Sequence, residues 1–273
     1  MNAFPETLER TTPAPRGWRA DLALVGWQVA YEQRAFWRNR TRAFFSFGMP
    51  IMLLLLFASL NSGHIKELHN IPYVVFFLPG IMAYGIIITQ FVNMAGGLAI
   101  QRDNGLLKRM RGTPLPGWAY VAGRVGSTAL TSVSMAAVML ILGRVFYDVH
   151  VSAEGLVAVI LAVLLGAATF AALGMAAVSI IPNAEAAPVV ANVLILPLSF
   201  ISGIWYPMTD APTWLLDLAK VFPIQRLADA LQTAVDPVNH GSAFAGNDFL
   251  ILAVWLVAGA RLAMLFWRRE TAR

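Results

Sequence analysis

Side chains that could carry out catalysis are few in this chain, and their spacing argues against it. The lysines are Lys66, Lys108 and Lys220, and none of them follows a glycine or precedes a serine or threonine. The phosphate-binding loop of an ATPase needs that arrangement, because its lysine and its backbone amides hold the phosphates. The chain also has no cysteine, which excludes thiolate metal sites and disulfides. We therefore expect no catalytic residue and no ATP hydrolysis in this chain.

The histidines are His64, His69, His150 and His240, and all of them fall in segments that we expect to be loops. A metal site built on His64 and His69 is one interpretation of their spacing. Solvated loop histidines are the plainer interpretation, because metal-binding histidines are usually held by further ligands and hydrogen-bonding partners. The sequence therefore predicts no metal site.

The segment from Gln101 to Leu115 is the most informative part of the chain. It combines an apolar helical face with three basic side chains, followed by two residues that stop a helix. These are Leu106, Leu107 and Met110 on the apolar face, the basic Lys108, Arg109 and Arg111, and the helix-stopping Gly112 and Pro114. A short, rigid, exposed helix of this kind suits docking into a groove of a partner. The alternative is a patch of positive charge that only holds the topology.

The elements that must position this segment are membrane-spanning helices. Hydrophobic residues make up 58% of the chain and charged residues 13%, against about 45–50% and about 25% in soluble domains. Six apolar stretches are long enough to span a bilayer: about Phe44–Leu60, Tyr73–Ala95, Ala119–Gly143, Leu156–Ile181, Ala186–Tyr206 and Phe249–Trp267. Because they are continuously apolar, without the alternation of barrel strands, they are expected to be helices.

The distribution of basic residues predicts the orientation of these helices. Of the 20 lysines and arginines, 16 fall before the first stretch, between the second and third, or at the C-terminal end, when Arg124 near the start of the third stretch and Arg261 near the end of the sixth are included. Basic residues concentrate on the cytoplasmic side of membrane proteins. We therefore expect a multi-pass protein of the bacterial inner membrane with both termini in the cytoplasm. The net charge of +5 then reflects the membrane, and no nucleic-acid partner is expected.

Two further segments are predicted to be amphipathic helices. Residues 18–38 place Trp18, Val25 and Phe36 on one apolar stripe, which predicts an interfacial helix; a plain juxtamembrane anchor is the alternative. Between the fifth and sixth spans, Pro212 and Pro223 can each start a short helix, and we expect both to dip into the outer leaflet. The predicted fold is therefore all-α and integral to the membrane, with an N-terminal tail and interfacial helix over 1–42 and a six-span domain over 43–273.

Three motifs of this chain resemble the ABC-2-type transporter permeases, especially the branch of the daunorubicin-resistance multidrug exporters. The first runs from Arg102-Asp103-Asn104-Gly105 to Gly112-Thr113-Pro114-Leu115, the second from Ser202-Gly203-Ile204-Trp205-Tyr206-Pro207 to Leu231, and the third is Leu78-Pro79-Gly80-Ile81. The resemblance covers nearly the whole chain, and the first two motifs together are fairly specific. One departure is Asn104, where the family more often has an acidic residue.

The resemblance implies partners and roles for particular residues. Two permease copies, identical or paralogous, would pair in the bilayer, and two ABC ATPase subunits would supply ATP and magnesium, with no cofactor in this chain. The family's cytoplasmic coupling helix corresponds to Arg102, Asp103, Asn104, Gly105, Leu106, Leu107, Lys108, Arg109, Met110 and Arg111. The pathway would run between the protomers, where Gln90, Asn93 and Asn192 are the polar candidates for contact with cargo. These three could equally hold neighbouring helices together.

The expected function is the membrane-spanning subunit of an ABC exporter. It would move an amphiphilic drug, lipid or polyketide outward, as in multidrug efflux and antibiotic resistance. Export of a polysaccharide or glycolipid is the nearest alternative within the family. An ATP-independent secondary carrier is less well supported, because no aspartate or glutamate lies deep within a predicted span, where coupled carriers usually keep ionisable groups. A purely structural scaffold is the third alternative.

Overall fold

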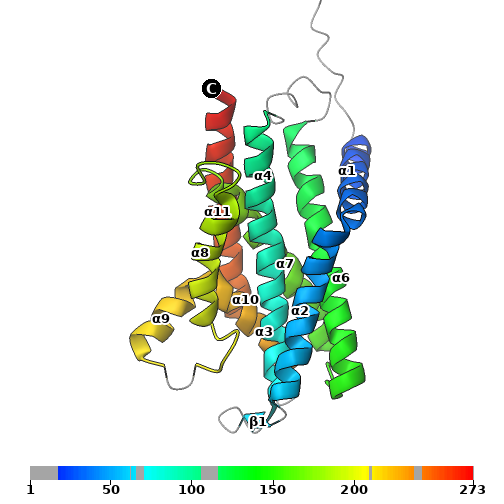
Figure 1. Cartoon of the computed structure of the whole chain (residues 1–273), viewed down its shortest axis with the longest axis vertical. Helices are drawn as coiled ribbons and strands as arrows, with labels where there is room; N and C mark the ends of the chain where they lie inside the picture. Colours follow the sequence, from blue (N-terminus) through cyan, green and yellow to red (C-terminus); the bar gives the residue numbers. More distant parts are fainter. Residues whose placement is uncertain are drawn as a thin grey trace, which may run out of the picture.

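The computed structural model of the chain describes residues 18–61, 63–65, 71–105, 116–208, 211–236 and 242–272, with side chains at all of these except 42 and 266–272. Almost all of this part of the chain is helical, and its long helices run roughly parallel (Figure 1). The elements are α1 (Trp18–Arg38), α2 (Arg40–Leu60), β1 (His64–Ile65), β2 (Ile71–Pro72), α3 (Tyr73–Ile87), the π-helix η2 (Ile88–Val92), α4 (Asn93–Asp103), α6 (Gly117–Tyr147), α7 (Ala153–Ala177), α8 (Ala187–Phe200), α9 (Thr213–Val221), α10 (Pro223–Val235) and α11 (Gly246–Ala272).

Five helical segments are long and apolar enough to cross a membrane. They are Ala43–Leu60, Tyr73–Asp103, Gly117–Tyr147, Ala153–Ala177 and Gly246–Leu265, which match five of the six predicted spans. The predicted fifth span is shorter than expected, because α8 has 14 residues and is therefore about 21 Å long, against a hydrocarbon core of about 30 Å. The all-helical membrane fold is thus confirmed, and its six-span topology stays a prediction.

The second span, formed by α3, η2 and α4, is the central helix of the bundle. Nearly every side chain of α3 is buried, and small residues let the neighbouring helices approach this core closely. Gly174 of α7 lies against Phe91 of η2, and Gly166 of α7 lies against Leu227 of α10. Small residues at helix crossings allow this close packing of backbones in membrane proteins.

The helix α1 packs along α6 with one face and leaves the other exposed. The Gln33 amide donates hydrogen bonds to the Ser127 carbonyl oxygen at 2.6 Å and to Thr131 Oγ1 at 3.1 Å. Trp27 and Tyr31 lie on the outer side and are 72% and 66% exposed. An amphipathic helix with protein on one face and aromatic residues on the other fits the position predicted at the membrane interface.

The two outer helices predicted from Pro212 and Pro223 are present as α9 and α10. The helix α10 is more deeply buried than a helix resting on a leaflet, because Leu227, Ala230 and Leu231 are fully enclosed by the bundle. In Figure 1, α1 and the C-terminal end of α11 lie at one end of the molecule, and β1 and α9 lie at the other. This arrangement agrees with an even number of crossings. The division at residues 42 and 43 stays a prediction.

Candidate coupling site

The predicted coupling segment begins at the end of α4. Of its ten residues, Arg102, Asp103, Asn104 and Gly105 lie within the part of the chain that the structure describes, and residues 106–111 lie outside it. The helix ends at Asp103, and Gly105 has a φ of +66°. Glycine adopts this left-handed conformation without the steric cost of a side chain, which is why it commonly ends helices.

Arg102 connects this end of α4 to the loop between α7 and α8. Its Nη1 atom donates to the carbonyl oxygens of Val178 at 3.2 Å and Ile181 at 3.0 Å, and its Nη2 atom donates to that of Pro182 at 3.0 Å. The carbonyls that follow a helix end lack partners within the helix, and a cation there is favoured by the helix dipole. Arg102 therefore caps the C-terminal end of α7.

Asp103 connects the same loop to α4 from its other side. One of its carboxylate oxygens accepts a hydrogen bond from the backbone amide of Ala184 at 2.7 Å, and the other accepts one from Arg102 Nε at 3.1 Å. Within the loop, the Asn183 side chain accepts a bond from the Ala186 amide at 2.8 Å. The loop that begins at the end of α4 is thus joined at its root to the loop between α7 and α8.

Beyond residues 106–115 in the chain, α6 is joined to α4 by hydrogen bonds between polar side chains. Arg124 Nη1 donates to the Tyr120 hydroxyl at 2.9 Å, and this hydroxyl donates to Gln101 Oε1 at 2.6 Å. Arg124 is 7% exposed and packs against the backbone of Gly97. The helices that enter and leave the coupling segment are therefore held together by hydrogen bonds as well as by apolar contact.

The three pathway candidates differ in how far they are exposed. Gln90 is fully buried in η2, and its amide donates to Ser132 Oγ at 2.9 Å, while its Oε1 atom has no hydrogen-bond partner. Asn93 is half-buried and Asn192 is exposed on α8. A π-helical turn inside a span often marks a functional position. Contact of these three residues with cargo stays a prediction.

At the opposite end of the molecule, two of the motifs pack against each other. A side chain added at Gly80 of α3 would place its Cβ 2.5 Å from the carbonyl oxygen of Ile204. The Tyr73 hydroxyl donates to the Trp205 carbonyl oxygen at 3.2 Å, and the Trp205 ring lies 5.0 Å from that of Tyr84. The turn after α8 is therefore held on the central helix by a backbone contact that only glycine permits.

Two carboxylates and one arginine form a partly buried cluster where α10 meets α11. Arg226 pairs with Asp248 at 2.7 Å, with their side chains 12% and 13% exposed. Burial and, to a lesser degree, the charge of Asp248 raise the pKa of Asp229 to about 7, although Arg226 and a hydrogen bond from Gln225 oppose the rise. The Gln225 Oε1 atom is buried without a partner. A protonated Asp229 could donate to this oxygen once the amide has turned over.

We expect this cluster to make stability depend on pH. A carboxyl group whose pKa is raised from 3.8 to about 7 binds a proton more tightly when folded, so stability falls as the pH rises from about 4 to about 7. Over pH 5 to 8 the loss is about 2 kcal/mol after allowance for partial exposure. Thermal unfolding in detergent should show it, and Asp229→Asn should flatten the profile. If Asp229→Asn had the same pH profile as the unaltered protein, the assignment would be contradicted. The control is the exposed Asp217→Asn, which should leave the profile unchanged.

Sequence reasoning identified Arg102 and Asp103 but not their partners. The loop at 178–186 supplies mainly backbone carbonyl and amide groups, and these leave no trace in residue types. Arg124 was counted only as a positive charge that sets orientation, although it is a buried hydrogen-bonding residue. Its position seven residues inside α6 was the one feature that could have indicated that Arg124 is buried.

The fold defines a multi-pass helical membrane protein, and the comparisons define its family. Residues 24–235 match the ABC-2 type transporter family. The chain is 21% identical over 210 residues to the inner membrane transport permease YadH of Escherichia coli K12, covering 76% of this chain and 79% of that protein. It is 20% identical over 245 residues to the putative transport permease YvfS of Bacillus subtilis 168, covering 90% of this chain and 97% of that one.

The chain belongs to the ABC-2 type transporter family, because the family match extends over most of its length. It is a transport permease and a multi-pass inner-membrane protein. Permeases of this family are non-catalytic membrane subunits that generally work with an ABC ATPase, in agreement with a sequence that has no phosphate-binding loop.

Proposed function

We propose that this permease exports an amphiphilic compound, such as a drug, a lipid or a polyketide, using ATP hydrolysed by two copies of a separate ATPase subunit. Two permease copies form the pathway, both termini are cytoplasmic, and ATP and magnesium bind to the partner alone. The predicted coupling helix receives the movement of the ATPase. A polysaccharide cargo would require a wider pathway lined with more aromatic residues, and no contact among the residues that the structure describes favours it.

The observation that supports this mechanism best is the set of hydrogen bonds around Arg102 and Asp103. A helix that was pushed by a partner would move the bundle only if it were firmly connected to it. Arg102 and Asp103 bond four backbone groups of the loop between α7 and α8. Force on the segment that follows α4 would therefore reach three helices together.

The first experiment is to purify the permease from its native membrane and identify what accompanies it. We expect an ATPase with a phosphate-binding loop to co-purify in stoichiometric amount. Vesicles that contain the permease alone should not transport cargo, and vesicles that contain both subunits should do so when ATP is supplied. Transport by the permease alone would favour a secondary carrier. An assembled complex with no cargo-stimulated ATP hydrolysis would favour a scaffold.

Reversing two charges in the predicted coupling helix should uncouple the complex. In Arg109→Glu with Arg111→Glu, the acidic side chains would repel the surface that the basic ones contact, so we expect transport to fall at least tenfold while insertion is unchanged. ATP hydrolysis should continue without stimulation by cargo. The matched control is Arg268→Glu with Arg269→Glu, which reverses two charges near the C-terminus. Equal loss in both double variants would count against a specific role for the coupling helix.

A further inference from the structure

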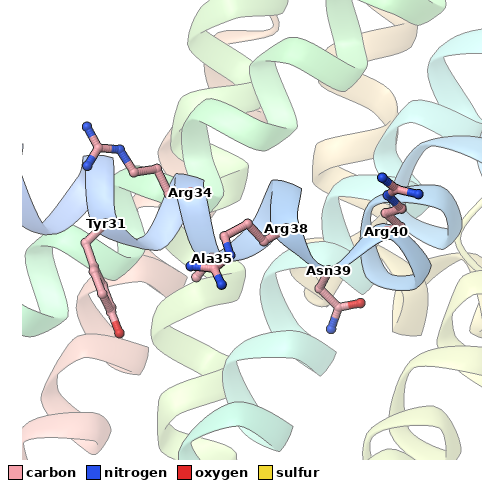
Figure 2. A pocket seen from close by; sticks show the side chains of 6 residues that line it. All are labelled: Tyr31, Arg34, Ala35, Arg38, Asn39 and Arg40. Carbon is pink, nitrogen blue, oxygen red and sulfur yellow. The ribbon is translucent and has the colours of Figure 1, made fainter.

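The elbow between α1 and α2 carries an unexplained group of basic residues. The chain turns at Asn39, and a shallow depression of about 820 Å³ opens there. Figure 2 shows the six residues that line it, which are Tyr31, Arg34, Ala35, Arg38, Asn39 and Arg40. Arg34 and Arg40 project to one side of the ribbon, and Arg38 lies back along α1 beside Ala35.

None of these three arginines forms an ion pair with any carboxylate that the structure describes. Arg102, Arg144 and Arg226, in contrast, each pair with an aspartate. Three neighbouring cations without counter-charges repel one another, and an anion that bound among them would remove that repulsion. The elbow therefore has the charge of an anion-binding site.

The position of the elbow along the bundle indicates where this anion comes from. The apolar window of the first span begins at Ala43, three residues after Arg40. Tyr31 and Trp37 are exposed beside the arginines, and such aromatic residues concentrate at the level of the lipid headgroups. The arginines therefore lie at the depth of the phosphate groups of the surrounding leaflet.

An apolar groove continues from this elbow along α2. It has a volume of about 760 Å³ and is lined by Phe44, Phe45, Gly48, Met49, Ile51, Met52, Leu55, Leu56, Ser59 and Leu60. Arg40, Phe44 and Gly48 follow at spacings of four residues and therefore share one face of the helix. At Gly48 the groove is covered by the Phe44 ring, which would lie 3.3 Å from an added Cβ. Along the chain, the basic residues at the start of α2 are thus followed by an apolar groove on the same helix.

We propose that the elbow and this groove bind one anionic phospholipid of the surrounding leaflet, with its phosphate on Arg34, Arg38 and Arg40 and an acyl chain along α2. Arginine forks bind phosphate oxygens in pairs. The groove alone could accept a second copy of this chain, and the arginines alone could accept an acidic protein. The lipid is favoured because it has both chemistries at the observed order and spacing.

The test measures binding of phosphatidylglycerol to the full-length protein in mild detergent by native mass spectrometry. We expect one tightly retained phosphatidylglycerol per chain and no comparable retention of phosphatidylethanolamine. The first triple variant combines Arg34→Gln, Arg38→Gln and Arg40→Gln. Its phosphatidylglycerol affinity should fall about a hundredfold, because each arginine near an anionic lipid raises the affinity about fivefold. The matched control, Arg10→Gln, Arg16→Gln, Arg19→Gln, removes the same charge; Arg19 lies about 22 Å from Arg34 along α1 and should change binding less than twofold.

A second variant tests the groove without touching the charges. Gly48→Trp places a large side chain in the groove and should weaken phosphatidylglycerol binding at least tenfold. Glycerol 3-phosphate, which has no acyl chain, should bind poorly to the unaltered protein and to every variant. Equal weakening in the two triple variants would overturn the proposal, as would glycerol 3-phosphate binding as tightly as the lipid. Efficient cross-linking between the α2 helices of two copies through cysteines at Met52 would also overturn it. Each of these results leaves the proposed transport function standing.

Discussion

Replacing Arg102 by methionine should reduce transport at least tenfold without preventing insertion. The substitution keeps the apolar stem but removes the guanidinium that bonds the carbonyl oxygens of Val178, Ile181 and Pro182. Each bond to a charged donor contributes about 1.5–3 kcal/mol, so the loop between α7 and α8 should lose its fixed position. Transport into vesicles that contain the ATPase measures the effect, and hydrogen exchange should rise at residues 178–186.

The ranking of neighbouring variants makes this result specific. Asp103→Asn keeps a side-chain oxygen that can accept from the Ala184 amide, so its effect should be smaller than that of Asp103→Ala. Arg19→Met serves as the matched control, because Arg19 lies on the exposed α1 and its only described contact is with the Trp18 ring, at 5.3 Å. If Arg102→Met transported as well as the unaltered protein, the loop would not transmit movement.

Replacing Gly80 by alanine should strongly destabilise the part of the bundle where the turn after α8 packs on α3. The new Cβ would lie 2.5 Å from the carbonyl oxygen of Ile204, and this atom belongs to the backbone, so no change of rotamer can relieve the clash. Forcing the turn away from α3 would also disturb the bond between Tyr73 and the Trp205 carbonyl oxygen. Overpacking of this kind costs about 1–3 kcal/mol and sometimes more. A lower thermal midpoint in detergent and a loss of transport are the expected readings.

The same span contains a matched control for this substitution. Gly96 of α4 has nothing within 4 Å of an added Cβ, so Gly96→Ala should be neutral or should stabilise the helix by up to about 1 kcal/mol. If both alanine variants unfolded at the same temperature, the contact between the two motifs would not contribute to the stability of the bundle.

Much of the fold was predictable, because a bilayer imposes strong rules on sequence. Backbone groups in hydrocarbon must bond within their own segment, so the long apolar runs had to be helices, and five of them are long and apolar enough to span. The prolines at 212 and 223 marked the starts of α9 and α10. Lengths were less predictable: α8 ends at Phe200, although apolar residues continue beyond it, because the chain turns at Gly203, whose φ is +67°, to pack on α3.

The sequence by itself determined the class of the protein, the positions of five long apolar helices and the absence of a phosphate-binding loop. It also predicted, through the resemblance to the family, which segment forms the coupling helix. These features depend on residue type and local spacing, which hydropathy, helix geometry and motifs report directly. Only the tertiary structure showed that Arg102 bonds the loop after α7, that Gly80 lies against the backbone of Ile204, and that the elbow arginines line one depression. Such contacts join residues far apart in the chain, often through backbone atoms that every residue possesses, so their partners could not be identified before the helices were packed.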